Sequence, residues 1–89
     1  MDKDKTLTLI KRYTSTAETH LRKADREYAY YKNEKFGDPQ AHYLTSQQCY
    51  SKAKEMAEKT LQTMDAEGIN DPNLRARLNA IILKCNNNR

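Results

Sequence analysis

Apolar residues recur every three or four positions through the first third of the chain. On a helical wheel of 100° per residue, one set of them falls within an arc of roughly 80°. The set comprises Ile10, Tyr13, Ala17, Leu21, Ala24, Tyr28 and Tyr31. Spacings of three and four that add up to seven are typical of helices that pack along a narrow seam. The pattern therefore predicts one long amphipathic helix with a coiled-coil-like partner.

Two further segments show the same helical periodicity. In the second segment the apolar and small residues cover a wider arc of roughly 140°, which predicts contact with two neighbouring helices. These residues are Tyr43, Ser46, Cys49, Tyr50, Ala53, Met56, Ala57, Thr60, Leu61 and Met64. The third segment is shorter and carries its apolar residues on one face. They are Leu74, Leu78, Ile81, Ile82 and Cys85.

Helix-breaking residues separate the three segments. Residues 37–39 read Gly-Asp-Pro, and residues 68–72 read Gly-Ile-Asn-Asp-Pro. Aspartate is a good helix N-cap, proline fits the first helical position, and glycine suits the end of the preceding helix. We therefore expect an all-α protein with one helix in each segment.

A chain of 89 residues has room for one small hydrophobic core. We expect a single helical domain over residues 1–89, built as an antiparallel three-helix bundle. A short turn near residue 37 makes the first two helices an antiparallel hairpin. The expected helices lie at about 5–35, 39–66 and 72–86, with frayed ends at about 1–4 and 86–89.

The register of this hairpin follows from the sequence, because facing residues of two antiparallel helices have numbers with a constant sum. A sum of 74 places an apolar residue opposite each of six seam positions. The predicted pairs are Ile10/Met64, Tyr13/Leu61, Ala17/Ala57, Leu21/Ala53, Ala24/Tyr50 and Tyr31/Tyr43. Large side chains face small ones in two of these pairs, Leu21/Ala53 and Ala24/Tyr50, as interdigitating layers require.

The third helix is expected to be too short to cover the whole hairpin. It spans about 22 Å, against about 40 Å for each hairpin helix, at a rise of 1.5 Å per residue. The tip of the hairpin, roughly residues 24–50, should therefore protrude as a two-helix arm. We expect an exposed patch there that binds a protein partner or a second copy of the chain, unless its tyrosines pack only on one another. The patch comprises Tyr28, Tyr31, Tyr43 and Tyr50.

The charge of the chain adds a second hypothesis. The formal net charge is +4, which permits binding to nucleic acid without requiring it. On the polar side of the first helix a tyrosine shares a face with cations, an arrangement that can stack on a base and bind phosphate. The acid Glu27 lies close by and weakens this interpretation. The candidate nucleic-acid-binding residues are Arg12, Lys23, Arg26 and Tyr30.

The sequence offers few groups for catalysis or metal binding. His20 and His42 lie far apart in the predicted register, so no tetrahedral set of ligands assembles around them. Cys49 and His42 could share a face of the second helix, but two ligands fall short of a zinc site, and a catalytic pair would need an orienting group. Cys49 and Cys85 both fall at apolar positions, which predicts buried free thiols. We therefore expect a non-enzyme without metal, cofactor or small-molecule substrate.

No apolar run approaches the roughly 20 residues that span a bilayer, and no signal-peptide pattern follows the N-terminus. We expect a cytoplasmic protein that makes no membrane contact and keeps its thiols reduced. The favoured function is a small protein-interaction module, such as an adaptor, small chaperone, inhibitor or assembly subunit. The alternative is a nucleic-acid-binding accessory protein.

Overall fold

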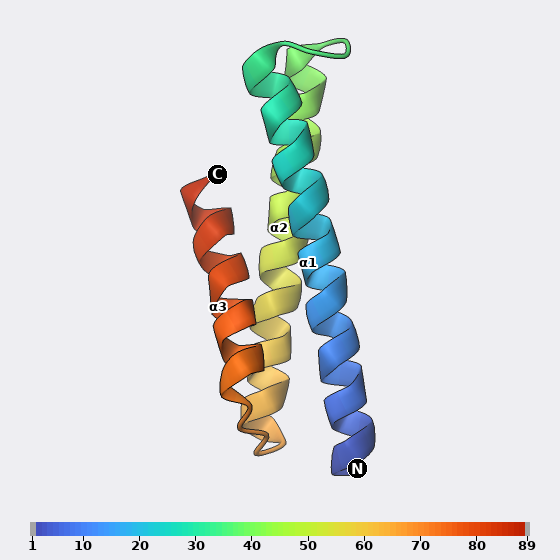
Figure 1. Ribbon diagram of the computed structural model, residues 1–89, viewed down its shortest axis with the longest axis vertical. Coiled ribbons are helices and arrows are strands. Elements are labelled where there is room, and N and C mark those ends of the chain that lie inside the picture. The colour runs from blue at the N-terminus through green and yellow to red at the C-terminus, as the bar shows by residue number, and fades with distance from the viewer. Residues whose placement is uncertain (1, 89) are drawn as a thin grey trace.

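The computed structural model describes residues 2–88. Within them the chain forms two long helices and one shorter helix. The helices are α1 (Lys3–Asn33), α2 (Pro39–Ala66) and α3 (Pro72–Asn87). α1 and α2 run antiparallel as a hairpin, and α3 turns back along its lower part (Figure 1). The predicted all-α bundle, with a long hairpin and a shorter third helix, is confirmed.

An aspartate side chain begins each helix. A carboxylate oxygen of Asp2 accepts a hydrogen bond from the Asp4 amide, and Asp38 and Asp71 cap α2 and α3 in the same way. Proline follows at the first helical position of α2 and α3, as the two Asp-Pro pairs predicted. Such a cap typically stabilises a helix by about 1 kcal/mol over alanine.

The helix ends differ from the prediction by a few residues. α1 already begins at Lys3 and α3 continues to Asn87, so the segments expected to fray are partly helical. The outermost residues of those segments, 1 and 89, lie outside the described residues. α1 ends at Asn33 because Glu34 adopts a left-handed backbone with φ of 53°, which no helix can continue.

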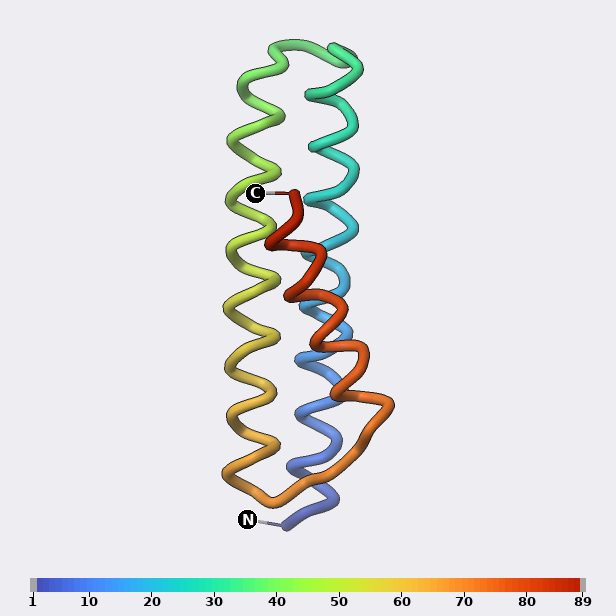
Figure 2. Tube along the Cα trace, turned by 90° about the vertical axis from the view of Figure 1, so that its left-hand side faces the viewer, coloured from blue at the N-terminus to red at the C-terminus, as the bar shows by residue number. Residues whose placement is uncertain are grey.

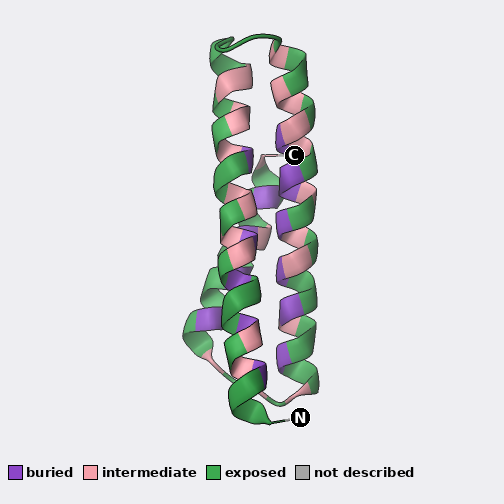
Figure 3. Ribbon diagram, turned by 90° about the vertical axis from the view of Figure 1, so that its right-hand side faces the viewer, coloured by how far each residue is buried: buried purple, intermediate pink, exposed green. Residues whose placement is uncertain are grey.

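The hydrophobic core is a narrow layer along the hairpin that widens where α3 joins it (Figure 3). Four alanines without exposed surface lie at the contact of α1 and α2, where small side chains let two helix backbones approach closely. They are Ala17, Ala24, Ala53 and Ala57. The apolar face of α3 is buried against this layer. It consists of Leu74, Leu78, Ile81 and Cys85.

One position of the predicted seam is wrong. Tyr13 is 40% exposed, and its neighbour Thr14 is buried instead. The lower part of α1 packs against α3 as well as α2, so its buried face is turned toward α3 and Tyr13 lies at the uncovered edge. Burying Thr14 leaves no hydroxyl unpaired, because the side chain donates a 2.8 Å hydrogen bond to the carbonyl of Ile10.

Tyr50 was expected on the exposed patch of the arm, and this expectation is also wrong. Its side chain is fully buried, and its hydroxyl donates a 2.6 Å hydrogen bond to the carboxylate of Asp25 on α1. The side chain of Asn88, just after α3, donates a 3.1 Å hydrogen bond to the same hydroxyl. Lys84 of α3 lies 3.0 Å from the other oxygen of Asp25. Burial, reinforced by Asp25, raises the pKa of Tyr50, so the hydroxyl stays protonated and can donate.

The Tyr50 hydroxyl should therefore contribute to the stability of the bundle. We expect Tyr50→Phe to lower the free energy of unfolding by about 1–2 kcal/mol, because the ring stays packed while a hydrogen bond to a charged group is lost. Urea unfolding followed by circular dichroism measures this. Tyr13→Phe is the matched control, since the Tyr13 hydroxyl makes no hydrogen bond within residues 2–88. Equal stabilities for Tyr50→Phe and the parent protein would contradict this role of the hydroxyl.

Candidate functional site

The upper part of the hairpin extends beyond α3. The side-chain amide of Gln47 donates a 3.1 Å hydrogen bond to the carbonyl of Asn88, which marks the level at which α3 ends. Above this level only α1, α2 and their connecting loop continue (Figure 2). We call this segment, residues 26–48, the arm. It is slightly shorter than the arm predicted from helix lengths, because Tyr50 is covered by the end of α3.

Most of the aromatic residues of the chain lie on the arm, in two groups. The first group is a row of tyrosines: the rings of Tyr28 and Tyr31 have centroids 5.8 Å apart, and those of Tyr31 and Tyr43 are 4.9 Å apart. The second contact confirms the predicted pairing of Tyr31 with Tyr43 across the hairpin. All three side chains are only half-buried. The tyrosines thus pack on one another and still present part of each ring to the surface.

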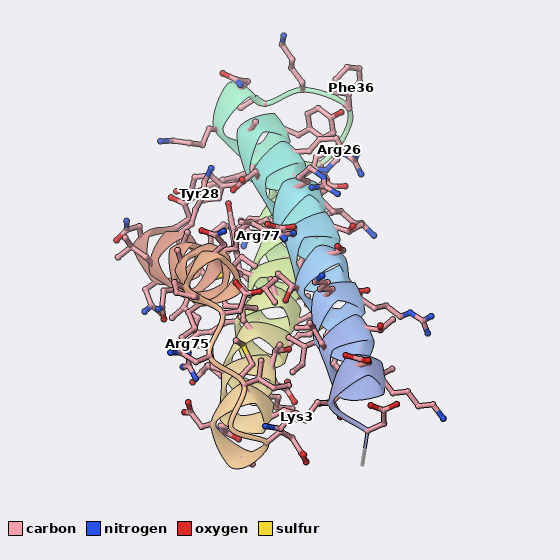
Figure 4. The ribbon with its side chains drawn as sticks, turned by 60° about the horizontal axis from the view of Figure 1, so that its bottom comes forward. Lys3, Arg26, Tyr28, Phe36, Arg75 and Arg77 are labelled. Atoms are coloured by element: carbon pink, nitrogen blue, oxygen red, sulfur yellow. The ribbon has the colours of Figure 1, made fainter. Side chains whose placement is uncertain are left out.

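The second group surrounds Tyr30 on another side of α1. The ring of Tyr30 contacts Phe36, with centroids 4.9 Å apart, and His42 at 5.3 Å. Phe36 itself is 73% exposed, and Figure 4 shows it on the same side of α1 as Arg26, away from Tyr28. The loop folds Phe36 back against the ring of Tyr30, which is half-buried and does not stand free beside Arg26.

His42 holds this second group together. One ring nitrogen, Nδ1, is hydrogen-bonded to the carboxylate of Glu27 on α1, and Nε2 lies 2.5 Å from the carbonyl oxygen of Phe36. Both partners accept hydrogen bonds, so both nitrogens donate only when the ring is protonated. The Phe36 carbonyl and then Glu27 raise the pKa of His42, and Asp38 contributes further. When it is protonated, the ring ties the loop to both hairpin helices.

The loop needs such a tie because its backbone is strained. Glu34 and Phe36 have φ of 53° and 59°, a left-handed conformation that costs about 1–3 kcal/mol for a side chain other than glycine. Gly37 follows with φ of 97°, where glycine is the residue of choice. The hydrogen bond from His42 to the carbonyl of Phe36 lies within this strained segment and helps to fix it.

The stability of the protein should depend on the protonation of His42. Its pKa is raised in the folded protein, so the stabilisation is complete below the ordinary histidine value of about 6.5 and is lost as the pH rises through the raised pKa. We expect the thermal unfolding midpoint to fall across that range in the parent protein and to fall less in His42→Gln. His20→Gln, which removes a histidine without a hydrogen bond in residues 2–88, is the control and should behave like the parent. Identical pH profiles for all three proteins would contradict the tie.

Three acids of α1 point toward the other helices. Glu18 accepts two hydrogen bonds from Arg77 of α3, at 2.5 and 3.1 Å, and these lower the pKa of that carboxyl. Asp25 pairs with Lys84, and Glu27 with His42. Arg77 and Lys84 of α3 are therefore paired with acids within the bundle. Arg75 also forms an ion pair, because its guanidinium lies 2.6 Å from the carboxylate of Asp65 on α2.

The cations on the outer side of α1 behave differently. Arg12, Lys23 and Arg26 are all exposed, as the nucleic-acid hypothesis requires, and none of them forms an ion pair in the described part of the chain. The structure thus keeps three of the four predicted nucleic-acid-binding residues on an open surface. The fourth, Tyr30, is turned into the loop cluster.

The remaining polar groups do not assemble a chemical site. Cys49 and Cys85 are buried and form no disulfide, as predicted, and His42 is bound to Glu27 and Phe36 instead of to Cys49. No three potential metal ligands gather anywhere in residues 2–88. A groove of about 510 Å³ separates α1 from α2 on one side of the hairpin. It is lined by Tyr13, His20, Lys52, Glu55, Met56, Lys59, Thr60 and Thr63.

None of the three helices, within the described residues, has an apolar stretch that could cross a bilayer. Comparison with protein-family models, with characterised proteins and with solved structures finds no match to this chain. Two surfaces of the molecule remain as candidates for function. One is the aromatic arm, and the other is the outer side of α1.

Proposed function

We propose that this protein is a small cytoplasmic interaction module whose arm binds a protein partner. One observation carries the proposal: the aromatic side chains gather on the part of the hairpin that α3 leaves uncovered. Phe36 is 73% exposed and Leu44 is 55% exposed on this arm, which also carries the half-buried tyrosines. Large exposed apolar side chains that cluster in one place are typical of a protein-binding surface.

The tyrosine row is suited to binding because it is already ordered. Tyr28, Tyr31 and Tyr43 hold one another by ring contacts, so docking a partner on them would cost little side-chain entropy. Tyrosine is among the residues enriched at the energetic centres of protein interfaces, since its ring buries apolar area and its hydroxyl can remain hydrated. Tyr50 has no part in this surface, because its ring is buried and its hydroxyl is bound within the bundle.

The arm is suited to bind a helical partner or a second copy of the same arm. Two antiparallel helices present parallel rows of side chains on which an amphipathic helix can lie. The two buried cysteines, which form no disulfide, fit a reducing compartment such as the cytoplasm. The proposed roles are those of an adaptor, a small chaperone, an inhibitor or an assembly subunit.

The test compares two arm variants with a control elsewhere on the surface. Phe36→Ser/Leu44→Ser removes exposed apolar side chains, and Tyr28→Ala/Tyr43→Ala removes two tyrosines of the row. Leu83→Ser is the matched control, since Leu83 is a 62% exposed apolar residue on α3. Circular dichroism first establishes that each variant is folded.

We expect the immobilised parent protein to retain a partner from native cell extract after nuclease treatment, or to self-associate in sedimentation equilibrium. Each arm variant should weaken that association by about tenfold or more, because truncating an anchoring aromatic typically costs about 2 kcal/mol. Leu83→Ser should leave it unchanged. A parent protein that is monomeric and retains the same proteins as both arm variants would overturn the proposal.

A further inference from the structure

The outer side of α1 carries a row of exposed cations along its length. On the helical wheel they lie within an arc of about 120°, directly opposite the side chains that α1 buries. We call this set the basic face. It comprises Lys5, Lys11, Arg12, Arg22, Lys23 and Arg26, all of them exposed. Between Lys5 and Arg26 no acid falls within this arc. The row extends for about 32 Å at 1.5 Å per residue.

In the folded protein these cations have no ion-pair partner among residues 2–88. Three acids of α1 are drawn to the other helices, where Glu18 binds Arg77, Asp25 binds Lys84 and Glu27 binds His42. No member of the basic face forms an ion pair in residues 2–88. Arg22 donates a hydrogen bond to the Thr19 hydroxyl, and it is near enough to Glu18 to help lower the pKa of that carboxyl.

From this separation of charge we infer that the basic face binds the phosphate backbone of double-stranded nucleic acid, independently of the arm. A duplex carries about one negative charge per 1.7 Å of its axis, so a row of this length meets phosphates in any register. Lys11 and Arg12 recur as Arg22 and Lys23 eleven residues later, three helical turns or about 16 Å along the axis. Both pairs therefore point in the same direction and can contact one ligand together.

The surroundings of the cations favour a duplex over a single strand. Proteins that bind single strands stack bases on exposed aromatic rings. The basic face has no aromatic residue, and the nearest candidate, Tyr30, is engaged by Phe36 and His42. The residues between the cations are short: the hydroxyls of Thr8 and Thr19 donate to carbonyls of their own helix. We therefore expect the basic face to contact phosphates and to show little sequence preference.

A membrane surface fits less well. Helices that lie on anionic bilayers combine cations with large apolar side chains that enter the lipid. The arc of the basic face contains small and polar residues between its cations, such as Thr8, Ser15 and Thr19. It has no such anchor.

The first measurement is the fluorescence anisotropy of a labelled 20-base-pair duplex titrated with the full chain at 50–200 mM salt. We expect weak binding, with a dissociation constant of about 10⁻⁴ to 10⁻⁶ M at physiological salt, that is similar for two unrelated sequences. With up to six phosphate contacts, the logarithm of the association constant should fall with the logarithm of salt concentration with a slope of about −5.

Two triple variants, each of which removes three positive charges, distinguish binding by the basic face from attraction by the net charge of the protein. Arg12→Gln/Arg22→Gln/Lys23→Gln should weaken binding by about tenfold or more and reduce the slope by about 3, one unit for each lost phosphate contact. Lys35→Gln/Lys52→Gln/Lys54→Gln removes three cations that are also free of ion pairs in residues 2–88 but lie outside the basic face. It should leave the slope nearly unchanged. The arm variant Phe36→Ser/Leu44→Ser should bind the duplex as the parent does.

Several results would overturn the inference. They are the absence of duplex binding at 50 mM salt, equal weakening by the two triple variants, tighter binding of a 20-nucleotide single strand, or binding only to vesicles that contain anionic lipid. Circular dichroism of each variant shows whether the helices are intact. The substituted residues are surface cations without ion pairs, so the fold should survive.

Discussion

The hydrogen bond between Tyr50 and Asp25 is the contact that separates the three-helix part of this molecule from the two-helix arm. It joins α2 to α1, and Lys84 and Asn88 at the end of α3 bind the same two side chains. The buried hydroxyl of Tyr50 would be costly without a partner, so this junction favours one arrangement of all three helices. Below it the helices share a core. Above it the hairpin continues without α3.

The contacts that hold α3 in place also determine where charge remains on the surface. Arg77 and Lys84 reach across to Glu18 and Asp25, so these two acids of α1 are paired inside the bundle. The cations on the outer side of α1 form no ion pair within residues 2–88. One set of packing contacts therefore leaves two distinct surfaces, an aromatic arm above the junction and a basic face along α1.

Much of this fold follows from periodicity and helix caps. The two Asp-Pro pairs fixed the starts of α2 and α3, and the short turn fixed the register that brings Tyr31 to Tyr43. Periodicity shows which side of a helix is apolar, but not which neighbour covers it. For that reason the exposure of Tyr13 was missed, since it depends on where α3 lies. The burial of Tyr50 was missed for the same reason, because its polar partners are far away in the sequence. A seam tyrosine on α2 with the acid Asp25 on the facing helix is the sequence signal that could have indicated the burial of Tyr50.

Residue-resolved amide hydrogen exchange tests this division of the molecule most directly. Amides of the body, in residues 17–24 and 50–60, should exchange slowly and together, since they open only when all three helices separate. Amides of the arm, in residues 28–33 and 42–46, should exchange faster, because only two helices and a strained loop protect them. Equal protection of arm and body would contradict the account, since it would mean that α3 does not divide the hairpin.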